Sequence, residues 1–471
     1  MENISLRMLA RNENIFKNRS YELDSNYSVN LRKKKRAKNV AIKRGLPTGD
    51  ITRDTYSQHL STLNRILLTN YSSSSIISTL IKVIQSFEES SYINPLSLDT
   101  NNLIPNIFKL LNSEFSPVFQ EELAHIIFLL LDKSGKHIAE ILLSKGLIPY
   151  LIRMLDTASN TLLETLFYSI GLISSVTVKG SECIINSGYL HKLDSCYLVV
   201  NSFEDLGPLF IWTIANLTRK NSELSLEDSK IIVKFFDKNF LKPYYKAQYE
   251  VLRAICGISY KSESHVQLLL KYNIPKYCID QCNHINEDIK ISAIKILGNM
   301  MVHLSSHIQV LLNLGVLEYF YSNISASALV KYEILWALGN IANGTAGQIA
   351  AVVEHQILQH VLQCMLDHNL KVRTEASNVL RNIIIKGCSQ STHILVHSGV
   401  LYYLKLGLED SDKRIVSNMI ISSVFLIHHN FIDLSTLQSS QILPVLESLL
   451  FKSNIPLSGL LIDFFNQIEN F

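Results

Sequence analysis

Two pentads, Trp212 to Asn216 and Trp336 to Asn340, contain both tryptophans of the chain, and each ends in an asparagine. Residues four apart lie on one face of a helix, so each pentad would present an indole beside a carboxamide. An indole face attracts an ammonium by about 0.5–2 kcal/mol, and an amide can donate to and accept from a peptide backbone. The pentads therefore predict a surface that binds a basic peptide.

The spacing of the pentads predicts the elements that position them. They lie 124 residues apart, which is three units of about 41, a length typical of armadillo or HEAT helical repeats. One interval between successive turns is doubled, so the repeat near residues 228–240 lacks its turn signature. Short turns between apolar stretches follow the same interval at Gly146, Gly188, Asn273, Gly315, Gln356 and Gly399.

The composition favours a stack of helices. Apolar residues make up 47% of the 471 residues, whereas 18 glycines and 10 prolines are too few for the turns of an all-β protein. Amphipathic runs such as 121–131 and 416–427 contain much of the apolar content. Because a solenoid buries one continuous core between neighbouring repeats, the length does not require several globular domains.

No stretch of 18 or more apolar residues lacks polar interruption, and the N-terminus has no apolar signal core. We therefore expect a soluble, intracellular protein without membrane insertion. The seven cysteines are scattered and odd in number, which suits reduced thiols.

Charge is concentrated at one end of the chain. Residues 1–50 contain twelve Lys or Arg and five Asp or Glu, a local charge of +7, whereas the remainder has a balance of −4. Such a cluster can bind nucleic acid, label a protein for nuclear entry, contact anionic lipid or remain a solvated run. Because the same chain contains pentads suited to lysine, a pairing or handover between this arm and the helical surface is also physically plausible.

The arm resembles the importin-β-binding arm of importin-α proteins. It contains Phe16-Lys17-Asn18, then Leu31-Arg32-Lys33-Lys34-Lys35-Arg36, then Ile42-Lys43-Arg44, in the order of the family. The resemblance implies an arm over residues 1–52 and a right-handed, all-α armadillo-repeat solenoid of about ten repeats over residues 53–471. The clear repeats would span about 115–425, with weaker capping repeats at each end.

The repeats are also similar to those of importin-α in the order of their variants. The segments 212–219, 257–260 and 293–299 follow that order, and segments 333–344 and 375–382 resemble the two repeats of the minor signal-binding site. The resemblance implies that cargo signals contact Trp212, Asn216, Asn299, Glu333, Trp336, Asn340, Glu375 and Asn382.

The chain departs from the family at the major signal-binding site. His125 and Leu129, then Tyr168 and Leu172, stand where two further Trp and Asn pairs are expected, and the family's aspartate falls near Val176. In the minor-type region only Asn378 departs, where the family has another tryptophan. We therefore expect a degraded major site and signal binding that depends mainly on residues 299–382.

The resemblance implies a nuclear import adaptor. It would bind basic nuclear localisation signals of cargo in a concave groove, link them to importin-β through the arm, and shuttle between cytoplasm and nucleus. An export receptor would be a further partner, and no direct nucleic acid partner is expected. The arm has one basic residue fewer than the family at Lys43-Arg44, which predicts weak autoinhibition.

Two other functions remain open. A general armadillo scaffold for non-basic partners is favoured by the missing major-site residues. A nucleic-acid-binding protein using the basic arm is disfavoured by the acidic body and the lack of interleaved aromatic residues.

The sequence gives little indication of catalysis or of a cofactor. Cys278, Cys282 and His284 are close in sequence, but a fourth metal ligand is not evident, so we interpret them as core residues. The sequence contains no Gly-rich phosphate loop, Gly-x-Ser-x-Gly elbow or His-Glu-x-x-His. We expect a protein that is not an enzyme and needs no cofactor.

Overall fold

The computed structural model describes most of the chain beyond residue 52. The described residues are 53–68, 73–89, 102–112, 117–201, 206–219, 222–240, 247–432, 436, 439–450, 459 and 461. All regular elements among these residues are helices. The predicted importin-β-binding arm, residues 1–52, lies outside them. The chain divides into two compact units between Asn106 and Ile107.

In the described residues of the first unit, two helices of similar length, α3 (Arg53–Leu68) and α4 (Ser73–Glu89), pack against each other. Their contact is apolar, because Leu60, Leu63 and Leu80 are almost fully buried. A third helix, α6 (Leu103–Leu111), begins in this unit and runs across the division.

The second unit repeats a pattern of two short helices followed by a longer third helix. The third helices are α7 (Pro117–Ser144), α9 (Asn160–Val176), α12 (Leu206–Leu217), α14 (Gln248–Ser259), α17 (Glu287–Met300), α20 (Ala328–Ile341), α23 (Leu370–Lys386) and α26 (Lys413–His428). In α7 the third helix continues across a kink at Gly135 into the first helix of the next repeat.

The other described helices of this unit lie between successive third helices, apart from α28, which follows α26. They are α8 (Leu147–Met154), α10 (Val178–Asn186), η1 (Tyr189–Lys192), α11 (Leu193–Val200), α13 (Leu226–Asn239), α15 (Glu263–Lys271), α16 (Ile274–Gln281), α18 (Ser305–Asn313), α19 (Val316–Asn323), α21 (Ala346–Val353), α22 (Ile357–Gln363), η2 (Cys364–Leu366), α24 (Ser389–His397), α25 (Val400–Leu408) and α28 (Ile442–Leu450).

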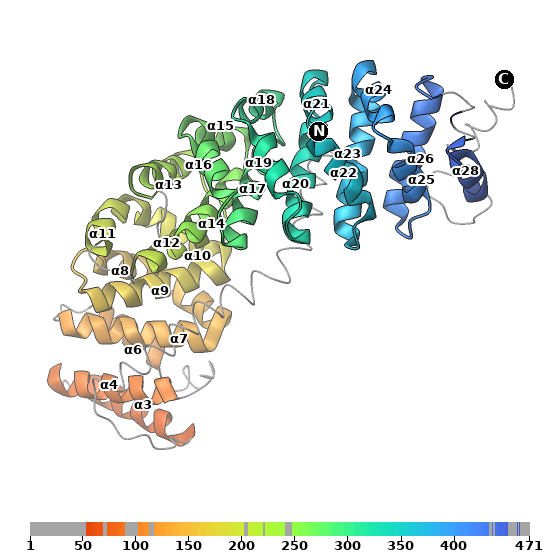
Figure 1. Cartoon of the computed structure of the whole chain (residues 1–471). Helices are drawn as coiled ribbons and strands as arrows, with labels where there is room; N and C mark the ends of the chain where they lie inside the picture. The colour runs from red at the N-terminus through yellow and green to blue at the C-terminus, as the bar shows by residue number, and fades with distance from the viewer. Residues whose placement is uncertain are drawn as a thin grey trace. The chain divides into compact units, whose positions relative to one another are not determined.

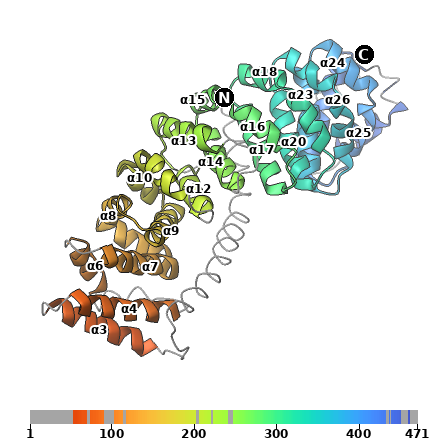
Figure 2. The same ribbon diagram turned by 60° about the vertical axis from the view of Figure 1, so that its left-hand side comes forward.

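The third helices form a continuous series within the second unit, which we call the third-helix ladder. Each packs against the next, from α7 through α9, α12, α14, α17, α20 and α23 to α26, as Figures 1 and 2 show. Residues at equivalent positions of successive ladder helices are separated by about 41 or 42 positions in the sequence. The ladder therefore brings Trp212, Trp336 and their sequence equivalents onto one series of helices.

Left-handed residues mark the turns between the short helices. Gly146, Gly188, Asn273, Gly315 and Gly399 have φ between 54° and 86°, a region that glycine and asparagine enter at low cost. Gln356 also lies in a turn, but its φ is −55°, and the side chain of His355 accepts a hydrogen bond from the Ile357 amide instead. All six predicted turns are confirmed.

Two further left-handed residues continue the series beyond the predicted turns. Asn102, with φ 50°, lies 44 residues before Gly146, and Gln441, with φ 58°, lies 42 residues after Gly399. Gln441 precedes α28 as Gly399 precedes α25. The repeat pattern thus reaches residues 102 and 441 in the sequence.

In the part that the structure describes, the repeat without a turn signature has a single helix in place of two. α13 is continuous, begins at a capping box between Ser225 and Asp228, and packs against η1 and α15. Aromatic residues fill this part of the core, where Phe210 and Phe235 are 5.8 Å apart between ring centroids. The protein is therefore an all-α armadillo-repeat solenoid, as predicted.

Candidate functional site

Both tryptophans lie against a glycine of the preceding ladder helix. A Cβ atom at Gly171 would be 1.9 Å from Trp212 Cζ3, and one at Gly298 would be 2.4 Å from Trp336 Cζ3. The two residues are only 5% and 7% exposed. Each indole therefore covers the backbone of the neighbouring helix and presents a narrow edge to solvent.

Each pentad asparagine binds the carbonyl of the same glycine. Asn216 Nδ2 donates to Gly171 O over 3.1 Å, and Asn340 Nδ2 donates to Gly298 O over 3.1 Å. A hydrogen bond of this kind stabilises a protein by about 1 kcal/mol. We call these two groups, each of one tryptophan, one asparagine and one glycine, the Trp212 clamp and the Trp336 clamp.

Asn382 makes the same bond one repeat later without a tryptophan. Its Nδ2 donates to Gly339 O over 3.1 Å, and the side chain is largely buried. A Cβ atom at Gly339 would meet only Val379 Cγ2, at 3.8 Å. The amide contact between ladder helices is thus independent of the indole.

Asn299 is placed differently from the other predicted asparagines. Its Nδ2 donates to Ser259 Oγ over 2.8 Å, and the residue is fully buried. Its Oδ1 is also buried, and no donor among the described residues binds it. Asn299 therefore lies in the interface between α14 and α17, behind the exposed face of the ladder.

The accessible polar groups among the predicted residues are on α20 and α23. Asn340 and Glu375 are both half-buried, whereas Glu333 is 4% exposed. Glu375 Oε2 accepts a hydrogen bond from Asn378 Nδ2 over 3.2 Å. No donor from the described part of the chain binds the Asn340 side-chain oxygen, which leaves it available to a peptide N–H.

The positions that depart from importin-α lie in an aromatic series on α7, α9 and α12. Phe128 and Tyr168 are 5.5 Å apart between ring centroids, and Tyr168 and Trp212 are 6.5 Å apart. His125 and Leu129 are also buried. On α7 and α9 the predicted major-site positions therefore bear neither an amide nor a carboxylate, whereas α12 bears the amide of Asn216.

Two cations lie on the ladder helices between the clamps. Lys295 belongs to the segment 293–299 that resembles an importin-α repeat, and its Nζ lies 5.7 Å from the centre of the Tyr260 ring. Arg253, which lies 41 residues after Trp212, was not recognised. Its Nη2 donates to Asn216 Oδ1 over 3.1 Å. The repeat spacing was the signal that could have identified it.

Equivalent ion pairs join α20 and α23 to the turns that precede α23 and α26. Lys331 Nζ and Asp367 Oδ2 are 2.8 Å apart, and so are Arg373 Nε and Asp410 Oδ2 one repeat later. Burial alone would raise the pKa of Asp367, but hydrogen bonds from Lys331 and a backbone amide outweigh it and the pKa is lowered. Burial of Asp410 is likewise outweighed by the hydrogen bond from Arg373, which lowers its pKa, so both carboxylates stay charged and tie each turn to the preceding ladder helix.

The remaining chemical candidates belong to the core. Cys278 and Cys282 are fully buried, and burial raises the pKa of the Cys282 thiol to about 12. No group of His, Cys, Asp or Glu side chains in the described residues is arranged to hold a metal ion. Within those residues, no helix has the length and apolar character needed to cross a bilayer.

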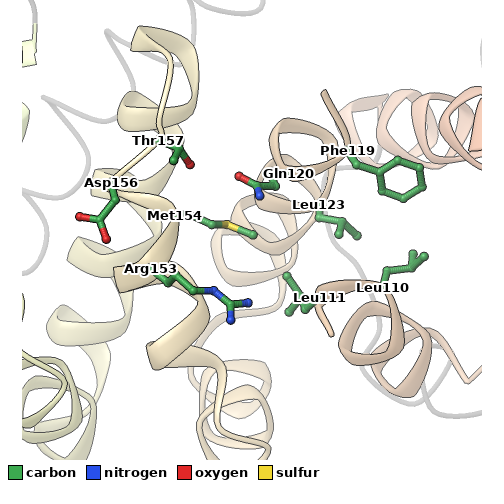
Figure 3. Close-up of a pocket in the computed structure, with 9 residues that line it drawn as sticks. All are labelled: Leu110, Leu111, Phe119, Gln120, Leu123, Arg153, Met154, Asp156 and Thr157. Atoms are coloured by element: carbon green, nitrogen blue, oxygen red, sulfur yellow. The ribbon is translucent and has the colours of Figure 1, made fainter. Parts of the chain in front are cut away.

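A pocket of about 390 Å³ lies apart from the predicted residues. Figure 3 shows Met154 pointing toward Gln120 and Leu123, with Leu110 and Leu111 on the neighbouring helix. None of the eight predicted signal-binding residues lines it.

Comparisons with known proteins agree with the fold and give a weak relationship by sequence. The chain is 21% identical to importin subunit alpha-1a of Oryza sativa subsp. japonica over 266 residues, 55% of this chain. The match covers 49% of that relative, so the chain spans about half its length. No model of a known protein family matches the chain.

Solved structures give a broader match. An engineered protein from the Northeast Structural Genomics Consortium covers 87% of this chain and 99% of its own, with a TM-score of 0.73 and 16% identity. A designed armadillo repeat protein in complex with a (KR)4 peptide covers 59% of this chain and 98% of its own, with a TM-score of 0.42 and 18% identity. At these identities, the first likeness shows the fold alone.

Proposed function

We propose that this protein is a nuclear import adaptor. In this proposal the third-helix ladder binds basic nuclear localisation signals around the Trp336 clamp, and residues 1–52 bind importin-β. The observation that carries the proposal is the position of two half-buried polar groups on adjacent ladder helices. They are the amide of Asn340, in the Trp336 clamp, and the carboxylate of Glu375 on the next helix. The weak sequence similarity to an importin α-subunit supports the same function.

The proposed peptide lies extended across α17, α20 and α23. Asn340 would accept a backbone N–H, and its second amide hydrogen would donate to a peptide carbonyl. The exposed edge of Trp336 would contact a lysine stem, and Glu375 and Glu333 would favour lysine or arginine over neutral side chains. Each contact is worth about 1 kcal/mol, so useful affinity needs several of them together.

The other predicted residues stabilise the packing of the ladder helices or belong to the Trp212 clamp. Asn382 joins α23 to α20, and Asn299 joins α17 to α14, so each holds one pair of adjacent ladder helices together. Trp212 and Asn216 form the Trp212 clamp, which contributes less to the affinity for the peptide.

The arm would supply the link to the transport receptor. Its proposed contacts with importin-β are Phe16, Lys17, Leu31, Arg32, Lys33, Lys34, Lys35, Arg36, Lys43 and Arg44. The local charge of +7 suits an acidic receptor surface and gives an attraction that salt weakens. Shuttling between cytoplasm and nucleus, with return by an export receptor, belongs to the same proposal.

A scaffold for non-basic partners is the second candidate. It is favoured by the two cations between the clamps, Arg253 and Lys295, which would repel a lysine-rich segment. A preference for an acidic or neutral peptide over a lysine-rich one would support this candidate.

One assembly experiment tests both halves of the adaptor proposal. Importin-β is immobilised, and a fluorescent lysine-rich peptide is added with or without the full chain. We expect retention of the peptide only with the chain, and a loss of about thirtyfold in apparent affinity with Asn340→Ala combined with Glu375→Gln, because two contacts of about 1 kcal/mol each are removed. Replacing residues 32–36 by alanine should release chain and peptide together.

The controls separate the two functions. The same peptide with glutamine in place of lysine should not be retained. Retention of both peptides alike, or retention of the lysine peptide by the Asn340→Ala and Glu375→Gln variant at unchanged affinity, would contradict the proposed site. Failure of the intact chain to bind importin-β would contradict the adaptor function.

A further inference from the structure

The two clamps differ in the side chain that the next ladder helix places beside them. Arg253 lies 41 residues after Trp212, and Asn378 lies 42 residues after Trp336, so the two occupy equivalent positions. α14 packs against α12, and α23 packs against α20. The comparison between these two positions is therefore internal to the molecule.

Arg253 reaches back into the Trp212 clamp. Its Nη2 donates to Asn216 Oδ1 over 3.1 Å and approaches the Trp212 carbonyl oxygen to 3.5 Å. With Asn216 Nδ2 already bound to Gly171 O, both polar atoms of this amide have partners inside the protein. Asn216 is fully buried as a result.

The position of Arg253 is held by two further features. Its Nε lies 2.8 Å from Glu250 Oε2, a charge contact in which the N–H does not point at the oxygen. One turn later, Gly257 brings α14 close to α12, since a Cβ atom there would lie 2.1 Å from Thr218 O. The guanidinium is therefore held against the clamp by its own helix.

Asn378 makes hydrogen bonds to residues outside the Trp336 clamp. Its Nδ2 donates to Glu375 Oε2 over 3.2 Å, and its Oδ1 accepts from Asn418 Nδ2 over 3.0 Å. Asn340 keeps its bond to Gly298 O and remains half-buried. Among the residues that the structure describes, no side chain binds Asn340 Oδ1 as Arg253 binds Asn216 Oδ1.

We infer that Arg253 closes the Trp212 clamp to basic peptides and thereby directs them to the Trp336 clamp. The guanidinium uses the amide oxygen that a peptide N–H would need, and its fixed charge repels a lysine or arginine placed beside Trp212. Arg253 is therefore a specificity-determining residue. This inference rests on the proposed function, because it concerns the same class of ligand.

A reciprocal exchange of the two residues tests the inference in the full chain. The chain has only two tryptophans, so Trp336→Phe leaves Trp212 as the sole indole reporter and Trp212→Phe leaves Trp336. A lysine-rich peptide is titrated while tryptophan fluorescence is recorded. Arg253→Asn is added to the Trp336→Phe chain, and Asn378→Arg is added to the Trp212→Phe chain.

The expected results are opposite for the two clamps. Trp336→Phe alone should show no fluorescence response, and adding Arg253→Asn should produce one. Trp212→Phe should respond, and adding Asn378→Arg should weaken its affinity about tenfold, because a charge-assisted hydrogen bond then occupies Asn340. Lys271→Asn, which removes an exposed cation from α15 and leaves both Arg253 and Glu250 in place, should produce no response in the Trp336→Phe chain.

Each contrary outcome shows whether the inference about Arg253 or the proposed function has failed. If Trp212→Phe responds but Arg253→Asn produces no gain, the inference is overturned and the proposed function stands. A response from Trp336→Phe alone, at an affinity close to that of Trp212→Phe, also overturns it. A gain with Arg253→Asn without any response from Trp212→Phe would support the inference and contradict the proposed Trp336 site. No response in any chain contradicts both, provided that circular dichroism shows unchanged helix content.

Discussion

Gly298 and Gly339 occupy equivalent positions on adjacent ladder helices, but only Gly298 lies beneath a tryptophan. We expect Gly298→Ala to destabilise the protein by about 1–3 kcal/mol, because the new Cβ lies 2.4 Å from a rigid indole ring. Gly339→Ala should be neutral or stabilising by about 0.5–1 kcal/mol, because the new methyl meets only ordinary contacts and alanine favours a helix. Thermal unfolding followed by circular dichroism compares them, and equal effects would contradict the clamp geometry.

At the residue scale the sequence correctly predicts which side chains share a helix face. Trp212 and Asn216 lie together on α12, as Trp336 and Asn340 do on α20. The sequence could not predict what these groups contact, because the partners Gly171 and Gly298 lie on another helix about 40 residues earlier. For this reason the nearly complete burial of both indoles was not foreseen.

Two histidines near the junction between α17 and α18 make the folding stability of the protein decrease in mild acid. Burial lowers the pKa of His303 and His307, although the nearby charge of Glu263 partly opposes this. Their folded pKa values are below the ordinary 6.5, so the unfolded chain binds more protons as the pH falls. This contribution is fully present above about pH 6.5 and is lost at lower pH.

We therefore expect the melting temperature to fall between pH 7.5 and pH 5.5, a range in which ordinary carboxyl groups stay charged. His303→Gln combined with His307→Gln should reduce that fall, since glutamine does not titrate. His428→Gln, at an exposed position, is the matched control and should leave it unchanged. An identical pH dependence in the double variant and the native chain would show that these histidines do not cause it.

For the whole molecule, the regular spacing of turns explains why the fold could be predicted from sequence. Gly146, Gly188 and Gly399 are needed because left-handed turns favour glycine, so they leave a visible periodic signal. Asn102 and Gln441 adopt the same conformation without glycine, and the outer repeats were correspondingly weaker in the sequence. The site was less predictable than the fold, since Arg253 acts through a contact between repeats.

The central claim concerns where a basic peptide binds. The most direct measurement is isothermal titration of a lysine-rich peptide into the intact chain, Trp336→Ala and Trp212→Ala, at a temperature where all three are folded. We predict that Trp336→Ala weakens binding about tenfold, whereas Trp212→Ala changes it by less than about threefold, because one indole contact is worth about 0.5–2 kcal/mol and Arg253 already occupies the other clamp. A larger loss from Trp212→Ala than from Trp336→Ala would contradict the account.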